Sequence, residues 1–550
     1  MKERGRLSKH KESRRRTGAQ ALVESLEKAG VEVVFGYPGG NVVDVFEAVR
    51  TSKFDFVLSR HEQGAVHMAD GYARASGRPG VVMVTSGPGL TNTITGLGTA
   101  NMDGVPMVLV CGQVPLCRIG TDAFQEADTT GLTRSVSKHN VLLHSADEIP
   151  SAIAEAFYVA THGKPGPVVI DIPLDVQREF TVEQYPVRVS LRSYHPESAA
   201  SPSEVRRLAK MLNDARRPVV YAGGGVIAAD AAKEVNHLAV KASVPVATTM
   251  MGIGSVDGRK PYSLGMAGVH GNRAANLALA QADVVLALGT RFNDRVTEGI
   301  DFASGAKIIH VDCDPSSINR NVRADLGIVA DIKDLLSAAD SRIKAVDRSK
   351  WIGKIAELKR ICREKPSPSL SDQIDPRDAI DAIADVVGED VILTTDVGQH
   401  QLFAAKYFPH VHPRKFITSG GMGSMGFGIP SAIGAAIARP GSRVVSIVGD
   451  GGAQMTFGEL IVAAERKLPV VFVVFVNGTL GLVRQMQKGA KIGSFATEIS
   501  SPDFKTLAAA YGIGSARVFK LPELRKAVAA AVRSKSPRLI EVFVGKEVDA

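Results

Sequence analysis

The sequence predicts an α/β protein with three doubly wound, parallel-sheet domains. Short runs rich in Val, Ile and Leu end in Gly-containing turns and precede Ala-rich stretches, which is the pattern of parallel βαβ units. These runs are continuously apolar, as are strands buried on both faces of a sheet. Two polar stretches rich in Pro and Ser, 183–204 and 363–376, separate three such segments. Ligands of these sheets bind at the carboxyl ends of the strands, so we expect functional residues in the turns after the runs.

The three segments are predicted as domains that follow a basic, disordered tail over residues 1–17. In the first domain, 18–183, we expect strands within 31–40, 81–89, 106–114 and 167–173. In the second, 201–340, the expected strands lie within 217–225, 283–291 and 306–315. In the third, 371–550, they lie within 390–398, 443–448, 469–476 and 538–544.

Composition excludes several classes of protein. The 550-residue chain is too long for one core, and its net charge of +9 comes mostly from the first twenty residues, which hold eight Lys or Arg against two Glu. We interpret this tail as solvated rather than as a nucleic-acid-binding arm, and we expect no nucleic-acid partner. No apolar segment follows the basic residues, and the longest apolar run, 468–476, is too short for a membrane span. The four cysteines form no CxxC pair, so we predict a cytoplasmic protein with reduced thiols.

Asp450 and Asn477 follow two neighbouring strands of the third domain. The stretch 443–476 reads as strand, helix and strand, and a right-handed crossover places both residues at the same edge of the sheet. A carboxylate, a carboxamide and a backbone carbonyl from the "NGT" turn would suit Mg²⁺ together with phosphate oxygens. Alternatively, Asp450 caps the helix and Asn477 occupies a left-handed turn position. The residues alone leave both interpretations open.

A competing pattern lies nearby in "SGGMGSMGFGIP". Gly421, Gly423 and Gly426 have the G-x-G-x-x-G spacing of a dinucleotide site, and Asp450 follows where such a site holds its ribose-binding acid. However, Asp450 comes after a strand, inside a second Gly turn, and no complete six-stranded unit follows the glycines. We therefore rank a nicotinamide-dependent dehydrogenase last among the candidate functions.

Two long stretches of the first domain carry a family resemblance. They are "RHEQGAVHMADGYARASGRPGVVMVTSGPGLTN" and "GQVPLCRIGTDAFQEADTTGLTRSVSKHN", and both closely resemble the pyrimidine-binding domain of acetolactate synthase catalytic subunits. The resemblance covers residues 18 to about 550. It implies a transferase that decarboxylates pyruvate and joins the remaining two-carbon unit to a second 2-oxo acid in branched-chain amino-acid biosynthesis. It also implies thiamin diphosphate, Mg²⁺ and an FAD that takes no redox part.

The resemblance assigns roles to residues of the first and third domains. Glu62 would bond N1′ of the aminopyrimidine, Met425 would be the apolar wedge that bends the cofactor, and Gln125 and Gly40 would line the reaction site. The metal ligands would be Asp450, Asn477 and Thr479. The remaining thiamin diphosphate contacts would be Val397, Gly398, Gln399, His400, Gly423, Gly449, Gly451 and Gly452.

The middle segment resembles the flavin-binding domain of the same family through "YAGGGV", "LGMAGVHG", "LGTRFNDRVT" and "HVDCDP". Substrate contacts would come from Phe124, Arg291 and Met486, although Arg291 is equally suited to a flavin-contacting or structural ion pair. The implied FAD contacts are Lys164, Gly223, Gly224, Gly225, Thr248, His270, Arg291, Asp312 and Asp331.

Three positions depart from the family pattern. Leu174 stands where typical members have a Lys, Met486 where many have a Trp that shapes the acceptor pocket, and Asn41 where a small residue is usual. These departures keep open another thiamin-dependent decarboxylase or carboligase, while a catalytically silent homologue ranks third. The resemblance further implies a homodimer or homotetramer in which Glu62 and Asp450 meet across a subunit interface, and it allows a small regulatory subunit.

Overall fold

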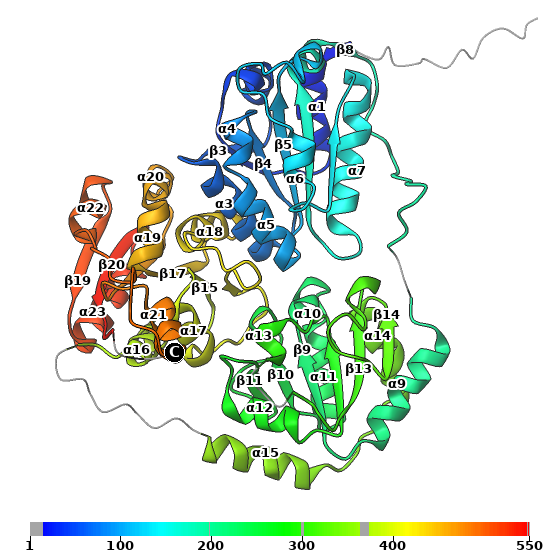
Figure 1. Ribbon diagram of the computed structural model, residues 1–550, viewed down its shortest axis with the longest axis vertical. Coiled ribbons are helices and arrows are strands. Elements are labelled where there is room, and N and C mark those ends of the chain that lie inside the picture. The colour runs from blue at the N-terminus through cyan, green and yellow to red at the C-terminus, as the bar shows by residue number, and fades with distance from the viewer. Residues whose placement is uncertain (1–14, 197–198, 299–301, 363–372, 547, 549–550) are drawn as a thin grey trace, which may run out of the picture.

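The computed structural model describes residues 15–196, 199–298, 302–362, 373–546 and 548. It contains three domains, each with a six-stranded parallel sheet flanked by helices, which confirms the predicted fold class (Figure 1). The predicted tail lies largely outside the described residues. Its last two residues form strand β1 (Arg16–Thr17), which pairs antiparallel with β8 (Phe180–Thr181), so the ordered first domain begins earlier than predicted.

The sheet of the first domain has the strand order β3-β2-β4-β5-β7-β6. Its strands are β2 (Val33–Gly36), β3 (Asp55–Leu58), β4 (Gly80–Val84), β5 (Met107–Gln113), β6 (His139–Leu142) and β7 (Pro167–Pro173). Its helices are α1 (Gly18–Lys28), α2 (Val43–Val49), α3 (Glu62–Ser76), α4 (Pro88–Thr91), α5 (Ile94–Asp103), α6 (Thr129–Thr133), α7 (Ile149–Thr161) and α8 (Leu174–Arg178).

The second domain has the order β11-β10-β9-β12-β13-β14, which is that of dinucleotide-binding sheets. Its strands are β9 (Pro218–Ala222), β10 (Val246–Thr248), β11 (Ser263–Met266), β12 (Val284–Leu288), β13 (Lys307–Asp312) and β14 (Leu326–Val329). Its helices are α9 (Pro202–Asp214), α10 (Gly224–Ala228), α11 (Ala232–Lys241), α12 (Arg273–Ala280), α13 (Asp294–Thr297), α14 (Ile332–Ala339) and α15 (Ser349–Ile361). Helix α15 lies beyond the predicted boundary at 340, yet its Trp351 packs into this domain's core.

The third domain repeats the topology of the first, with the order β16-β15-β17-β18-β20-β19. Its strands are β15 (Val391–Thr395), β16 (Phe416–Ile417), β17 (Arg443–Gly449), β18 (Val470–Val476), β19 (Gly514–Val518) and β20 (Arg538–Phe543). Its helices are α16 (Pro376–Val387), α17 (Gln399–Tyr407), α18 (Gly428–Ala438), α19 (Asp450–Thr456), α20 (Leu460–Glu465), α21 (Gly481–Gly489), α22 (Phe504–Ala510) and α23 (Leu521–Ala531).

In each sheet the first strand along the chain has later strands on both of its sides, so the strand order changes direction beside it, and such a point is where ligands of open α/β sheets bind. The reversal lies between β2 and β4 in the first sheet, between β9 and β12 in the second, and between β15 and β17 in the third. Short 3₁₀ turns follow several of these strands, among them η1 (Gly40–Val42) shortly after β2. Each set of predicted site residues therefore includes members beside one of these three points.

The first and third domains share one hydrophobic core. Helices α3 and α18 cross so closely that a β-carbon at Gly434 would lie 1.8 Å from the carbonyl oxygen of Met68, and one at Gly71 would lie 2.1 Å from that of Ser431. Side chains from both sheets pack on this helix pair, with Phe35 and Val82 from one and Val444 and Phe472 from the other. Figure 1 shows α3 and α18 side by side between the two sheets.

Within the described parts of the chain, no helix combines the length and the apolar character that crossing a membrane requires.

Candidate active site

Asp450 begins helix α19 at the carboxyl end of β17 and is almost completely buried. Its Oδ2 accepts hydrogen bonds from the backbone N–H groups of Asn477 (3.1 Å) and Gly478 (2.8 Å) and from the Ser501 hydroxyl (2.7 Å). These donors fix the carboxylate, while its Oδ1 accepts only from the adjacent Gly451 N–H (3.0 Å) among the hydrogen bonds of the described residues. Asp450 and Asn477 thus meet at one edge of the sheet, as their spacing predicted.

The metal interpretation of this pair requires a mixed set of oxygen ligands. Asn477 Oδ1 accepts from the Thr479 N–H at 3.1 Å, so the "NGT" turn curls back over the carboxamide. Among the described residues, no three His, Cys, Asp or Glu side chains gather as a metal site. A carboxylate, a carboxamide oxygen and a backbone carbonyl from the turn at Thr479 are nonetheless suited to Mg²⁺, which keeps other positions for water and phosphate.

The turn after β15 forms a close-packed cradle beside Asp450. Asp396 is buried and accepts from the N–H groups of Val397, Gly426 and Gly428 at 2.7–3.1 Å. Burial raises the pKa of Asp396 to about 6, although these backbone donors favour the charged form. A β-carbon at Gly452 would lie 2.4 Å from Asp396 Oδ1, so only glycine fits there.

His400 completes the cradle. A β-carbon at either Gly398 or Gly449 would lie 3.0 Å from Cε1 of its ring, so both predicted glycines face the imidazole. Burial lowers the pKa of His400 to about 4, and its buried Nε2 has no protein partner in the described structure. A neutral imidazole donates only from the nitrogen that carries its proton, so a bond to a phosphate oxygen here requires the Nε2–H tautomer. Its neighbour Gln399 is already engaged with Gln485 and the Val548 carbonyl.

Met425 and Gly423 lie in the segment between β16 and α18. The methyl carbon of Met425 is 3.4 Å from where a β-carbon of Gly451 would stand, so its side chain packs against the turn that holds Asp450. Gly423 has φ +68°, a conformation that glycine adopts without strain. The G-x-G-x-x-G spacing therefore belongs to a loop of the third domain that leads from edge strand β16 into α18, not to a dinucleotide site at a strand reversal.

Glu62 is the first residue of α3, in the first domain. Its carboxylate is half-buried and accepts from Asn92 Nδ2 at 2.9 Å. Thr85 and Gly89 connect the Gly39–Gly40 turn after β2 to this carboxylate. A β-carbon at Gly39 would lie 2.4 Å from the Thr85 side chain. One at Gly89 would lie 2.6 Å from the same side chain and 3.8 Å from Glu62 Oε1. Asn41 is fixed there by a 2.6 Å bond from its Nδ2 to Ser86 Oγ.

Gln125 joins the same cluster from the loop after β5. Its φ is +61°, and Gly87 packs so closely on it that a β-carbon at Gly87 would lie 2.9 Å from the Gln125 carbonyl oxygen. The neighbouring Phe124 side chain is 87% exposed on the single chain. Glu62, Gly40 and Gln125 thus gather at the carboxyl ends of the first sheet.

Two buried acids near this cluster were missed in the sequence. Glu459, from the third domain, accepts the N–H groups of Arg60 (3.0 Å) and His61 (2.9 Å) and so fixes the entry to α3. Burial raises the pKa of Glu459 to about 7. Asp171, near the end of β7, accepts a hydrogen bond from Gln113 Nε2. The same amide also donates to the carbonyl of Ala127, two residues after Gln125. Their partners lie far away in the sequence, so no local pattern could have identified either acid.

Asp171 gives the first prediction, on stability against pH. Burial raises its pKa to about 7, so the folded protein binds more protons than the unfolded chain from about pH 4 to pH 7. Its contribution to the free energy of unfolding therefore falls as the pH rises through that window. Asp171→Asn lacks this loss. Between pH 5 and pH 8, its free energy of unfolding should therefore rise relative to that of the unmodified protein by on the order of 3 kcal/mol. Denaturant titrations at both pH values measure this gain, and an equal difference at the two would contradict the assignment.

A cavity of about 1170 Å³ opens at the strand reversal of the second domain. This is slightly above the usual range for ligand pockets, roughly 300–1,000 Å³, and suits a large cofactor. Gly223 and Gly225 pack against the turn after β12, since β-carbons there would lie 2.2 Å from the Gly289 carbonyl oxygen and 2.6 Å from its Cα. Seven predicted flavin contacts line the cavity: Lys164, Gly224, Gly225, His270, Arg291, Asp312 and Asp331.

The remaining two predicted flavin contacts, Gly223 and Thr248, are not among the lining residues, although their neighbours Gly224 and Thr249 are. The charged side chains of the cavity are partly desolvated. Burial, and then Arg291, lowers the pKa of Lys164, and burial raises the pKa of Asp312 to about 6. Burial, and then Arg295, lowers the pKa of His270.

The cavity is lined from all three domains, with Asp103 and Lys164 among its first-domain residues. Val397, Gly423 and the 44%-exposed Met486 line it on the third-domain side, whereas Glu62 and Gln125 are not among its lining residues. The single chain thus places the third-domain residues beside the predicted flavin site. The cluster of Glu62, Gly40 and Gln125 does not line that cavity.

Comparison with known proteins agrees with these three groups of residues. Residues 16–132 match the "Thiamine pyrophosphate enzyme, N-terminal TPP binding domain", 205–339 the "central domain" and 396–542 the "C-terminal TPP binding domain". A probable acetolactate synthase large subunit of Methanocaldococcus jannaschii is 43% identical, with 96% of this chain and 92% of that protein aligned.

Two further relatives come from other branches of life. The mitochondrial acetolactate synthase catalytic subunit of Saccharomyces cerevisiae is 41% identical over 97% of this chain and 81% of its own length. The acetolactate synthase large subunit of Haemophilus influenzae is 40% identical over 97% of this chain and 94% of its own length.

Proposed function

The chain belongs to the acetolactate synthase large subunits, within the thiamine pyrophosphate enzymes, and we propose that it makes acetohydroxy acids from 2-oxo acids. It decarboxylates pyruvate and transfers the remaining two-carbon unit to a second 2-oxo acid. With pyruvate as acceptor the products are 2-acetolactate and CO₂, and with 2-oxobutyrate the product is 2-aceto-2-hydroxybutyrate. The reaction serves the biosynthesis of valine, leucine and isoleucine.

The observation that supports this proposal best is the Asp450 site. A fixed carboxylate with one lightly bonded oxygen stands at the strand reversal of the third sheet, beside a carboxamide. A neutral, unpartnered His400 nitrogen lies in the neighbouring cradle of glycines. A site of hard oxygen ligands beside an imidazole that can donate a hydrogen bond to phosphate fits Mg²⁺ and a diphosphate. Its residue types match those that the family resemblance implies.

Each group of residues has a separate task. Bound thiamin diphosphate supplies the electron sink for decarboxylation. Asp450, Asn477 and the Thr479 carbonyl would hold Mg²⁺, and the glycine turns around His400 would hold the diphosphate. The Met425 side chain would be the apolar wedge that keeps the cofactor bent. Glu62 would hydrogen-bond N1′ of the aminopyrimidine.

The substrate would be bound from two sides. Gln125, Gly40 and the exposed Phe124 would face it from the first-domain cluster, and Met486 from helix α21. Arg291 lines the shared cavity and would meet either the substrate carboxylate or the flavin. FAD would occupy the second-domain cavity and take no redox part. Lys164 would offer the flavin a positive charge without the bidentate contact that an Arg can make.

We place the working enzyme in the cytoplasm as a homodimer or homotetramer. The exposed Phe124 and the fact that the Glu62 cluster does not line the cavity support a site completed by a second copy of the chain. The relatives are named large or catalytic subunits, which supports a smaller regulatory partner for this chain.

The decisive experiment incubates the purified protein with thiamin diphosphate, Mg²⁺, FAD and pyruvate, and measures acetolactate and CO₂. Equal amounts of acetolactate and CO₂ are expected. Pyruvate consumed without acetolactate would favour another thiamin-dependent decarboxylase. No turnover with any 2-oxo acid would indicate a silent homologue. The visible absorbance of the purified protein tests flavin binding independently.

Met486 gives a second prediction, on acceptor choice. Its side chain lines the cavity from α21, and a Trp there would add a flat apolar surface against the extra methyl group of 2-oxobutyrate. We expect Met486→Trp to raise the ratio of acetohydroxybutyrate to acetolactate on the order of tenfold, since a buried methylene contributes 1–3 kcal/mol. Competition assays with both acceptors measure the ratio. Val483→Trp, an exposed position on the same helix, serves as the control, and an equal shift in both variants would contradict the assignment.

A further inference from the structure

One short segment of the third domain, which we call the glycine loop, residues 418–424, lies against both other domains. It connects β16 to α18 and contains Gly420, Gly421 and Gly423. Glycines restrict the backbone least of all residues, so this segment cannot define its own conformation. Contacts from outside the loop must hold it.

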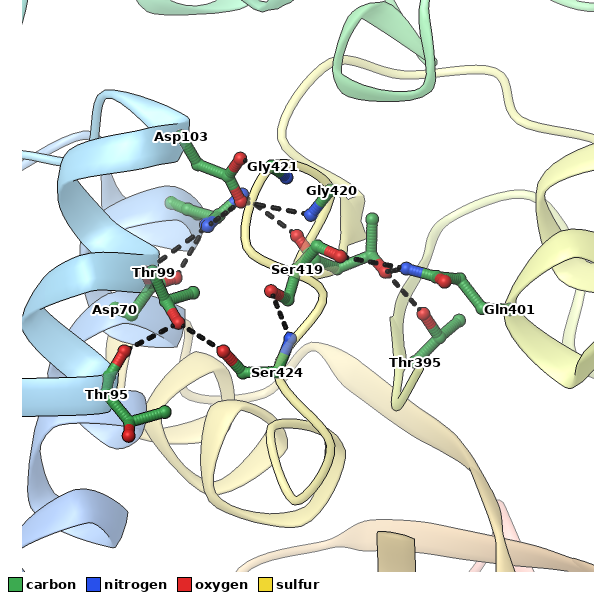
Figure 2. Close-up of polar contacts among 12 residues, drawn as sticks. Asp70, Thr95, Thr99, Asp103, Thr395, Gln401, Ser419, Gly420, Gly421 and Ser424 are labelled. Carbon is green, nitrogen blue, oxygen red and sulfur yellow. Dashed lines mark hydrogen bonds and ion pairs between the residues drawn. The ribbon is translucent and has the colours of Figure 1, made fainter. Parts of the chain in front are cut away.

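The strongest contact comes from Asp103, the last residue of helix α5 in the first domain. Its Oδ1 accepts the Gly421 N–H at 2.7 Å and its Oδ2 accepts the Gly420 N–H at 3.1 Å, as Figure 2 shows. The Asp103 side chain is fully buried. One carboxylate therefore binds two consecutive backbone donors that come from a different domain.

Arg74 fixes the orientation of that carboxylate. Its Nη2 lies 2.9 Å from Asp103 Oδ2, its Nε lies 2.6 Å from Asp70, and its Nη1 donates to the Thr418 carbonyl at 3.1 Å. The guanidinium thus joins α3, α5 and the start of the glycine loop. Hydrogen bonds between charged groups are about twice as strong as those between neutral groups, and several of them act here on one guanidinium. Asp103 cannot rotate without breaking them.

The same helix also holds the other end of the loop. Thr99 lies one turn before Asp103 on α5, and its hydroxyl is 2.7 Å from Ser424 Oγ. The Ser424 N–H in turn donates to Ser419 Oγ at 3.0 Å, which closes the loop on itself (Figure 2). Two residues on one helical face thereby define where the loop begins and ends.

The second domain closes the remaining side. A β-carbon at Gly420 would lie 2.3 Å from Sδ of Met251, and one at Gly421 would lie 3.3 Å from Nη2 of Arg291. The loop is thus enclosed between α5 and the second-domain cavity.

The loop leads directly into the cofactor residues. Met425 follows Ser424, and the next N–H, that of Gly426, is bonded to Asp396. Met425 therefore sits between an anchor on the first domain and an anchor on the third, and it packs toward Gly451. A change at Gly420 or Gly421 would be transmitted to its side chain.

We propose that Asp103 is a positioning residue, which binds Gly420 and Gly421 and, together with Thr99 on Ser424, sets Met425 and Gly423 for the thiamin cofactor. The catalytic part of this statement rests on the proposed function. Asp103 itself touches no reacting atom. Its carboxylate is needed because both of its oxygens accept an N–H, which an amide cannot do.

The test compares Asp103→Asn with Asp70→Asn in the full-length protein. Both variants remove one carboxylate from the same Arg74, but in the described structure only Asp103 also bonds the loop. In the apoprotein, we expect amide hydrogen exchange of the peptide spanning 418–424 to accelerate in Asp103→Asn and to stay within threefold of wild type in Asp70→Asn.

Kinetics provide a second comparison. A misplaced cofactor seat should lower kcat of Asp103→Asn on the order of 10²-fold, with KM for pyruvate within about threefold. Asp70→Asn should lose far less at an equal loss of thermal stability. If the two variants match in loop exchange and in kcat, Asp103 is only a structural ion pair and the proposal is overturned.

A second variant covers the case in which Asp103→Asn does not fold. Thr99→Val keeps the shape of Thr99 but removes the hydroxyl that holds Ser424, so the same peptide should exchange faster and kcat should fall about tenfold. Wild-type exchange and kcat in Thr99→Val would overturn the proposal. If wild-type protein makes no acetolactate, the proposed function fails, while the exchange experiment on the apoprotein still decides the role of Asp103.

Discussion

Replacing Glu62 by Gln is expected to lower kcat by on the order of 10²- to 10⁴-fold while the protein still binds thiamin diphosphate. The substitution keeps the size of the side chain and leaves Asn92 a partner oxygen. It removes the carboxyl group that would hold a proton at N1′ of the cofactor. Calorimetric titration with thiamin diphosphate, together with an acetolactate assay, measures both quantities.

The matched control for this prediction is Glu32→Gln. Glu32 belongs to the same domain but forms an exposed ion pair with Arg78, so its loss should leave kcat unchanged. Nearly full activity in Glu62→Gln would remove Glu62 from its assigned role. Loss of cofactor binding together with activity would make it a structural residue instead.

Replacing Asp450 by Asn is expected to weaken Mg²⁺-dependent binding of thiamin diphosphate by on the order of 100-fold or more. The amide carries no charge for the cation. Its nitrogen would face either the metal position or the N–H groups of Asn477 and Gly478, which now donate to a carboxylate oxygen. Titration with thiamin diphosphate at several Mg²⁺ concentrations separates metal binding from cofactor binding.

Two further variants calibrate that effect. Ser501→Ala removes one of the three donors to Oδ2 and should weaken binding several-fold at most, because two backbone donors remain. Asp385→Asn breaks an exposed ion pair with Arg525 elsewhere in the third domain and should change nothing. Unaltered Mg²⁺ dependence in Asp450→Asn would exclude Asp450 as a ligand and leave it a turn-capping residue.

Much of the fold and part of the site could be predicted because they depend on local patterns. Central strands such as β12 and β18 are continuously apolar, and all of their residues are buried. The spacing of Asp450 and Asn477 equals one βαβ unit, so topology alone brought them together. The identity of their ligand required the motif around Glu62.

The edge strands escaped prediction for a physical reason. Strand β3 is exposed at Asp55 and Leu58, and β19 is only half-buried along most of its length, so neither shows the apolar run of a central strand. Helix α15 also escaped, because its one apolar stripe follows a polar stretch that reads as the end of a domain.

The supporting acids of the site could not be predicted at all. Asp103 ends a helix just before Gly104, which is an ordinary position for a polar residue. Its partners Gly420 and Gly421 lie 317 and 318 residues away, and Glu459 lies 399 and 398 residues from Arg60 and His61. Such contacts depend on how the domains dock, and no property of the neighbouring residues encodes them.

The core shared by α3 and α18 has a consequence for synthesis on the ribosome. Gly71 and Ser431, which touch where the two helices cross, are separated by about 360 residues, or roughly 20 to 70 seconds of translation. During that time the nascent first domain presents the apolar side of α3 without its cover, while the second domain can already bury its own core. The first domain, although it is made first, can therefore complete the core around α3 only together with the third, and chaperones have a long opportunity to bind it at α3.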